Sequence, residues 1–144
     1  MEAHILVPVD ASSSSENAFD YVLAEMPEPK ITLLHVLNPL TLFNYPTAEG
    51  FDFERAKGTE RERREAVQEI FERYRDKDEA RDREIEAVIQ AGHPAEKILE
   101  YAETEDVDHI AMGSRDRSKL EEAVLGSVAR GVVKRSTVPV TIVP

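Results

Sequence analysis

Short apolar runs alternate along this chain with amphipathic stretches of helical period. These runs predict five strands, at residues 4–9, 30–36, 84–90, 107–112 and 138–143. The first run is rich in branched residues and is expected to be buried, whereas the third alternates weakly between apolar and polar positions. Between them, apolar residues recur at helical spacing and predict four helices, around residues 18–26, 67–74, 98–102 and 128–133. This alternation implies an α/β fold: a single five-stranded parallel sheet, doubly wound, with helices on both faces and the strand order 3-2-1-4-5.

Two of the predicted helices are preceded by capping signals. Ser13 with Glu16, and Thr59 with Glu62, have the spacing of a capping box. The segment 38–58 lies between the second strand and the second helix, and its prolines and glycine predict a long connection. Its aromatic residues indicate a packed loop rather than a free tail.

Length and charge narrow the class of protein. A chain of 144 residues suits one domain, here residues 1–144. The net charge of −11, from 29 acidic and 18 basic residues, repels nucleic acid and anionic membranes. The chain has no cysteine, which excludes disulfides and thiolate metal sites, and no apolar run long enough to span a bilayer. We therefore expect a soluble, cytoplasmic protein without nucleic-acid or membrane partners.

Asp10 is the first polar residue after the first predicted strand, and Ala11 and four serines follow it. In open α/β sheets, ligands bind beyond the carboxyl ends of the strands, where this segment would lie. A carboxylate there can accept hydrogen bonds from a ribose or a base. Alternatively, Asp10 only helps to cap the first helix, and the residue by itself supports both roles equally.

A second polar segment follows the fourth strand. It begins Gly113-Ser114-Arg115-Asp116, and Gly126-Ser127 then stands at the start of the last helix. A helix N-terminus offers free N–H groups and the positive end of the helix dipole, both of which favour phosphate. An ordinary loop with a serine cap is the alternative for an isolated Gly-Ser pair.

Several sequence motifs together resemble the universal stress protein family over nearly the whole chain. They are PVD after the first strand, LLHV in the second, AGHPAEKI at the end of the third, and AMGSRDRS, LGSVARGVV and STVPVTIV in the last third. The most specific piece is similar to the family's nucleotide motif of Gly, two residues, Gly, nine residues and Gly-Ser. The spacing is kept, but Asp116 replaces the second glycine.

This resemblance implies an adenine-nucleotide site. The positions that match the family's binding residues are Val9 and Asp10 for the ribose and base, Val36 for the adenine, Met112 and Gly113 beside the ribose and phosphates, and Gly126, Ser127 and Val128 for the phosphates. The resemblance also implies a homodimer formed through the last strand, residues 138–143. The family contains members that bind ATP and members without nucleotide. The loop 38–58 would either cover the nucleotide or serve a partner.

Asp116 is the position at which this chain departs from the motif. Two unit charges about 5 Å apart repel by roughly 3 kcal/mol at an effective dielectric near 20, which corresponds to roughly a hundredfold in affinity. Ser114, Arg115 and Arg117 are candidates for binding phosphate or compensating this charge, and Lys119 lies in the same loop. A Mg²⁺ ion held near Asp10 or Asp116 is a further candidate. We expect binding of ATP, or of AMP or ADP.

Three functions remain open at this point. The favoured one is a dimeric nucleotide-binding module that acts in a stress response through an unknown protein partner. The second is a protein-interaction module of the same fold without nucleotide. The third and weakest is an enzyme, with at most slow ATP hydrolysis. The four histidines match no metal motif, and a P-loop is absent, so no catalytic residue is predicted.

Overall fold

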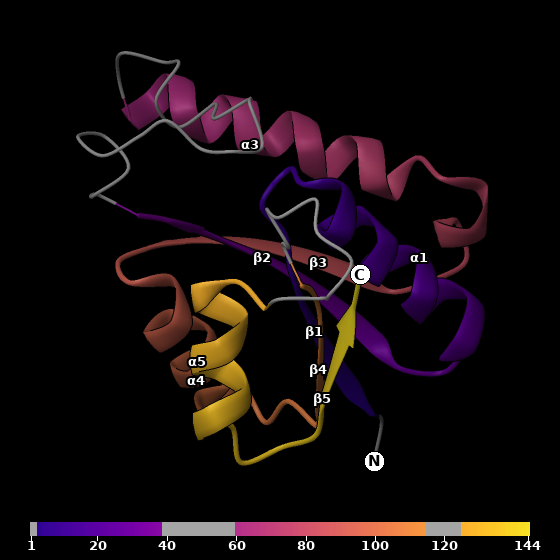
Figure 1. Ribbon diagram of the computed structural model, residues 1–144. Coiled ribbons are helices and arrows are strands. Elements are labelled where there is room, and N and C mark those ends of the chain that lie inside the picture. The colour runs from indigo at the N-terminus through magenta and orange to yellow at the C-terminus, as the bar shows by residue number, and fades with distance from the viewer. Residues whose placement is uncertain (1–2, 39–59, 115–124) are drawn as a thin grey trace.

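The computed structural model describes residues 3–38, 60–114 and 125–144 (Figure 1). Within these ranges the chain forms one five-stranded sheet in which every pair of neighbouring strands is parallel. The strands are β1 (His4–Pro8), β2 (Lys30–Leu37), β3 (Ile85–Ala91), β4 (His109–Gly113) and β5 (Val140–Val143), in the order β3-β2-β1-β4-β5. The predicted fold class and strand order are therefore confirmed.

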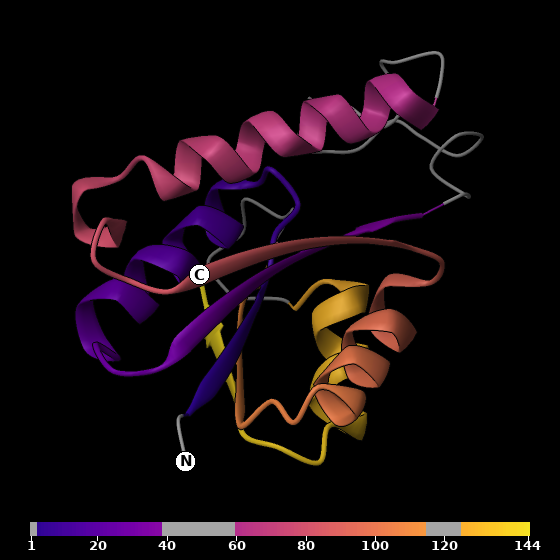
Figure 2. The same cartoon turned by 180° about the vertical axis from the view of Figure 1, so that it is seen from behind.

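Helices cover both faces of the sheet, as the alternating pattern predicts. The helices α1 (Ser13–Glu25) and α3 (Glu60–Arg75), with a short 3₁₀ helix η2 (Asp78–Ala80), lie on one face. The helices α4 (Pro94–Thr104) and α5 (Ser127–Arg135) lie on the other, and Figure 2 shows them side by side. None of the helices in the described part of the chain is long and apolar enough to cross a membrane.

The central strand β1 joins two hydrophobic cores. Ile5 and Val7 face α1 and α3, whereas Leu6 faces α4 and α5, and all three side chains are fully buried. This burial on both faces explains why the strand is a continuous apolar run rather than an alternating one. In the first core the rings of Phe19 in α1 and Tyr74 in α3 lie 4.9 Å apart, so the two helices are packed directly against each other.

The N-cap of α1 is Ser12, so the predicted capping box at Ser13 and Glu16 is wrong by one residue. The Ser12 Oγ accepts the backbone N–H of Ser15 at 3.1 Å. Glu16 instead lies in the first turn of the helix, where its carboxylate pairs with Lys77 at 2.7 Å. The Glu16 side chain, which local spacing assigned to the cap, thus forms an ion pair with a distant residue instead. The second predicted box and the connection 38–58 fall largely outside the described residues.

The strand β3 begins one residue later than the sequence predicts, and β4 and β5 begin two residues later. For β4 and β5 the reason is that turn hydrogen bonds hold the residues before them. The Val107 N–H closes the end of α4 by donating to the Ala102 carbonyl at 3.0 Å, across Asp106 with its φ of 56°. Ahead of β5, the Ser136 hydroxyl bonds both the N–H and the carbonyl of Val138. These turns start β4 at His109 and β5 at Val140.

Candidate functional site

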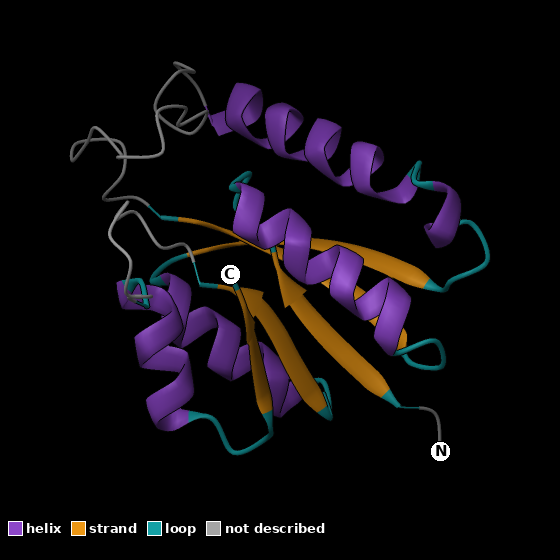
Figure 3. Ribbon diagram, turned by 45° about the vertical axis from the view of Figure 1, so that its right-hand side comes forward, coloured by secondary structure: helices purple, strands orange, loops and turns teal. Residues whose placement is uncertain are grey.

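The carboxyl ends of the parallel strands β1 and β4 lie at the same edge of the sheet, and the start of α5 joins β4 there (Figure 3). The Ser114 N–H donates to the Val143 carbonyl at 2.9 Å, and the Ser114 carbonyl accepts the Gly126 N–H at 2.9 Å. A Cβ on Gly113 would lie 2.5 Å from the carbonyl carbon of Ser14, so β4 also touches the first turn of α1. The structure thus brings together the two segments that the sequence singled out separately.

Asp10 is held in the turn that joins β1 to α1. Its Oδ1 accepts both the N–H of Ser12 at 3.0 Å and the hydroxyl of Ser12 at 2.6 Å. Asp10 therefore supports the residue that caps α1, which agrees with the capping role considered from the sequence. A carboxylate accepts about four hydrogen bonds, so this support is compatible with additional bonds to a ligand.

The serine run after Asp10 is mostly buried. Ser12, Ser14 and Ser15 are 7%, 8% and 3% exposed, whereas Ser13 is exposed. Their hydroxyls hydrogen-bond one another, Asp10 and the neighbouring backbone. The sequence assigned a role only to Ser13, as a capping residue, and did not indicate this network. Its position directly after a buried strand is the signal that could have indicated it.

Ala11 adopts a left-handed backbone conformation with a φ of 73°. This conformation costs an L-residue roughly 1–2 kcal/mol, whereas glycine adopts it freely. Ala11→Gly should therefore stabilise the fold by about 0.5–1 kcal/mol, after the greater entropy of the unfolded glycine chain is subtracted. Urea unfolding measures this change. Ala24→Gly, at an exposed site in α1, is the control and should destabilise; a loss of stability in both variants would contradict the prediction.

Val9 and Val36 lie at the edge and are largely buried, at 3% and 9% exposure. The Val9 N–H donates to the Leu34 carbonyl at 2.9 Å, and its own carbonyl lies 2.7 Å from His35 Nδ1. Because a carbonyl only accepts, His35 carries a proton on Nδ1. The backbone of Val36, two residues after Leu34, faces the same side of β2, where β1 has ended. Because both side chains are buried, only the backbones of these valines are left for a ligand, and both backbone groups of Val9 already have partners.

Met112 and Gly113 end β4 in a closely packed environment. The Met112 side chain is 5% exposed and belongs to the core under α4 and α5. Gly113 is buried, and its missing side chain is what allows the strand to approach Ser14. Ser114, 4% exposed, then links β5 to the start of α5 through its backbone. The first role of these residues is thus to assemble the edge.

The N-terminus of α5 is formed by Gly126, Ser127 and Val128. Gly126 is the N-cap with a φ of −66°, a conformation open to any residue, so here the glycine serves to leave the first turn uncovered by a side chain. Ser127 is exposed, and Val128 packs partly on the core. The first N–H groups of a helix lack partners within the helix and attract anions. Arg115, Asp116, Arg117 and Lys119 lie outside the described residues.

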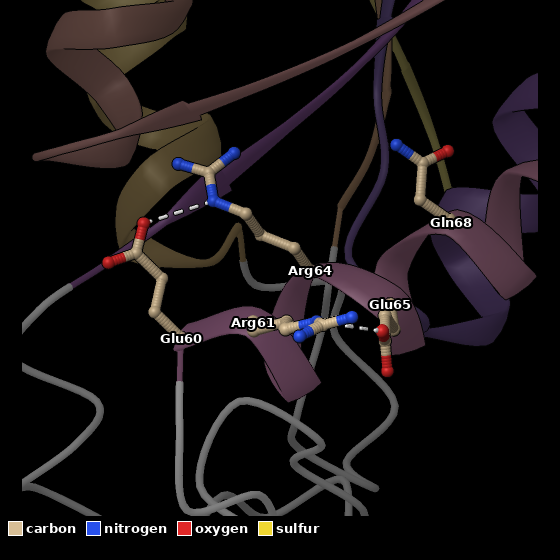
Figure 4. A pocket seen from close by; sticks show the side chains of 5 residues that line it. All are labelled: Glu60, Arg61, Arg64, Glu65 and Gln68. Carbon is tan, nitrogen blue, oxygen red and sulfur yellow. Dashed lines mark hydrogen bonds and ion pairs between the residues drawn. The ribbon is translucent and has the colours of Figure 1, made fainter.

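A hollow of about 450 Å³ occurs elsewhere, along the first turns of α3 (Figure 4). Its described lining is Glu60, Arg61, Arg64, Glu65 and Gln68. Glu60 pairs with Arg64 at 3.0 Å and Arg61 with Glu65 at 3.4 Å, so the charges are satisfied along one helix. None of these described lining residues is among the positions that the sequence motifs predict for nucleotide binding. Within the described ranges, no three histidine, aspartate or glutamate residues are grouped so that they could hold a metal ion.

The profile of the Universal stress protein family matches residues 1–144. This chain belongs to that family. It is 32% identical to the universal stress protein MJ0577 of Methanocaldococcus jannaschii over 99% of this chain and 95% of that protein, and the solved MJ0577 structure superimposes with a TM-score of 0.77, covering 99% and 96% of the two chains. The family therefore agrees with the fold, and the resemblance inferred from the sequence motifs is confirmed.

Two further relatives are similar over most of their length. The universal stress protein YxiE of Bacillus subtilis is 31% identical over 96% of this chain and 97% of that protein. A universal stress protein family member from Arabidopsis thaliana, solved with AMP bound, is 24% identical with a TM-score of 0.68, covering 98% and 90% of the two chains. The second of these shows the shared fold.

Proposed function

We propose that this universal stress protein binds an adenine nucleotide at the edge formed by β1, β4 and the start of α5. The observation that carries the proposal is the pair of Ser114 hydrogen bonds, to Val143 and Gly126, which tie the start of α5 to the ends of β5 and β4. The close approach of Gly113 to Ser14 connects this end of β4 to the helix start that follows Asp10. Phosphate would lie at the helix N-terminus, and the ribose hydroxyls would donate to Asp10. The Arabidopsis family member solved with AMP supports this ligand class.

The ligand would be ATP, or AMP or ADP. A bound Mg²⁺ ion would be coordinated mainly by phosphate oxygens and water, with one carboxylate such as Asp10 or Asp116. Asp10 fits this limited role, because Oδ1 is already committed to Ser12. A cage made only of protein ligands has no support in the described residues.

The protein would act as a homodimer in a stress response, through a protein partner that the nucleotide state selects. Among the described residues β5 pairs only with β4, so its other edge would be available to a second copy. Pro139 and Pro144 flank this four-residue strand and limit the length of regular pairing. Sedimentation should report a dimer, and a monomeric mass over a wide concentration range would contradict this.

Calorimetric titration of nucleotide-stripped protein with ATP and Mg²⁺, at low and at molar salt, tests the nucleotide site. We expect saturable binding. Ser127→Ala should weaken it by about five- to tenfold, because one hydrogen bond to a phosphate is lost. Ser136→Ala, at the opposite end of α5, is the control and should leave the affinity unchanged. Folded protein that binds nothing at either salt would favour the alternative, a protein-interaction module of the same fold.

A further inference from the structure

Tyr74 is a buried tyrosine of α3 whose hydroxyl contacts Ser15, next to the turn that contains Asp10. It comes from the end of α3, is fully buried, and lies with its hydroxyl 3.2 Å from Ser15 Oγ. Burial raises the pKa of the Tyr74 hydroxyl; the Ser15 hydrogen bond lowers it, and the negative charges of Glu16 and Asp10 raise it further. The hydroxyl is therefore protonated at neutral pH and available as a hydrogen-bond donor.

The hydrogen bonds around Ser15 have only one consistent direction. The Ser15 hydroxyl donates its single proton to the Pro8 carbonyl at 3.4 Å. It accepts the Asp10 N–H at 3.3 Å. A hydroxyl has one proton and two lone pairs, so the remaining partner, Tyr74, must donate to it. Tyr74 thus provides the last hydrogen bond to the Ser15 hydroxyl, which in turn binds the Asp10 N–H.

The same accounting applies to Ser12, which anchors the Asp10 side chain. An ionised carboxylate only accepts, so the Ser12 hydroxyl donates to Asp10 Oδ1 at 2.6 Å. It accepts the Ser15 N–H at 3.1 Å and lies 3.3 Å from Ser14 Oγ, which is then the donor of that pair. Ser15 therefore acts on Asp10 twice: its hydroxyl binds the Asp10 N–H, and its N–H orients the serine that holds the carboxylate.

We infer that Tyr74 is a positioning residue, which acts through Ser15 and Ser12 to hold the Asp10 carboxylate as the acceptor for the ribose hydroxyls of the bound nucleotide. The inference rests on the proposed nucleotide site, but the hydrogen-bonded chain exists in the ligand-free protein. Without the Tyr74 hydroxyl, the buried Ser15 side chain loses one of the three hydrogen bonds that fix its position, so its bond to the Asp10 N–H loosens. The turn in which Ser12 binds the Asp10 carboxylate then loosens with it. Ligand groups that do not touch Asp10 would be unaffected.

Tyr74→Phe tests this inference, with Tyr101→Phe as a matched control. Tyr101 is also a buried tyrosine, but it bonds Thr32 from the opposite face of the sheet. Two quantities are measured for each folded variant: the amide hydrogen exchange of Asp10, Ser12 and Ser15 without ligand, and the ratio of the dissociation constants of 2′,3′-dideoxy-AMP and AMP. This ratio isolates the ribose contacts from the rest of the binding energy.

In Tyr74→Phe we expect exchange at these three amides to accelerate by about tenfold, and the ribose ratio to fall by about fivefold with little change for the dideoxy compound. The control should keep the wild-type ratio and the wild-type exchange at these amides. An unchanged ratio in Tyr74→Phe, or a uniform loss of affinity for both compounds, would overturn the positioning role.

A wild-type protein that binds neither compound would refute the proposed nucleotide function, and the exchange measurement then decides the inference by itself. Faster amide hydrogen exchange in Tyr74→Phe, confined to Asp10, Ser12 and Ser15, would support a role of Tyr74 in positioning Asp10. Exchange equal to that of Tyr101→Phe would overturn it.

Discussion

Gly113→Ala is expected to lower the free energy of unfolding by about 3 kcal/mol. The added methyl group would lie 2.5 Å from the carbonyl carbon and the Oγ of Ser14 and 2.6 Å from its carbonyl oxygen. Two of these atoms are backbone atoms of the first turn of α1, which cannot move aside as a flexible side chain would. Either β4 or the start of the helix must shift, and both carry many buried contacts.

Urea unfolding followed by circular dichroism measures this loss. A domain of this kind retains a folded population after a loss of this size, because typical stabilities are about 5–15 kcal/mol. Gly131→Ala in α5 is the matched control, since its methyl group would meet only side-chain atoms, Ala95 Cβ at 3.2 Å and Arg135 Nη2 at 3.5 Å. That contact offsets a helix-propensity gain of about 1 kcal/mol, so the control should change little. If Gly113→Ala lowered the free energy of unfolding by less than about 1 kcal/mol, the first turn of α1 would be able to move away from the added methyl group, which would contradict the prediction.

Asp116→Gly is expected to strengthen ATP binding by up to about a hundredfold. The substitution restores the glycine of the family's nucleotide motif and removes a negative charge from the loop that precedes Gly126. If the carboxylate lies about 5 Å from a phosphate charge, the repulsion removed is roughly 3 kcal/mol. AMP carries fewer phosphate charges, so its affinity should rise less.

Asp116→Asn separates charge from backbone freedom, because it removes the charge but keeps a side chain. Equal gains for the two variants would assign the effect to charge, and a gain only for glycine would assign it to backbone conformation. Titrations at low and molar salt add a second check. Salt screens an exposed charge, so the difference in ATP affinity between the variants and the wild type should be smaller at molar salt. An ATP affinity unchanged in both variants would show that Asp116 does not face the phosphates.

The elements of the fold follow from local sequence pattern. The strands β1 and β2 are runs of apolar, mostly branched residues, and burial on both faces of a parallel sheet requires such a run. The edge strand β3 alternates weakly and is only partly buried. The sequence predicts the first residues of the strands less accurately. The strands β4 and β5 start two residues later than predicted, because Val107 and Val138 are held in turns. Apolar character predicts that these valines are buried, but not whether they lie in a strand or a turn.

The candidate site was only partly accessible to sequence reasoning. The order of strands and the rule for open α/β sheets placed Asp10 and Gly126 at one edge, and the structure brings their segments together. A role for Gly113 in packing against Ser14 was not predictable, since the two residues are 99 positions apart and neither local spacing nor composition encodes their contact.

The sequence by itself thus determined the class of fold and the family, because these depend on periodicity and on a motif read along the chain. It also predicts which edge of the sheet would bind a ligand. Only the tertiary structure decided how Asp10 is held. The hydroxyl of Tyr74 meets that of Ser15 across 59 residues of sequence. Ser12, Ser14 and Ser15 form a buried network against elements that lie far from them in the sequence, α3 at Ser15 and β4 at Ser14. Hydrogen bonds between distant segments depend on packing geometry, which no local pattern specifies.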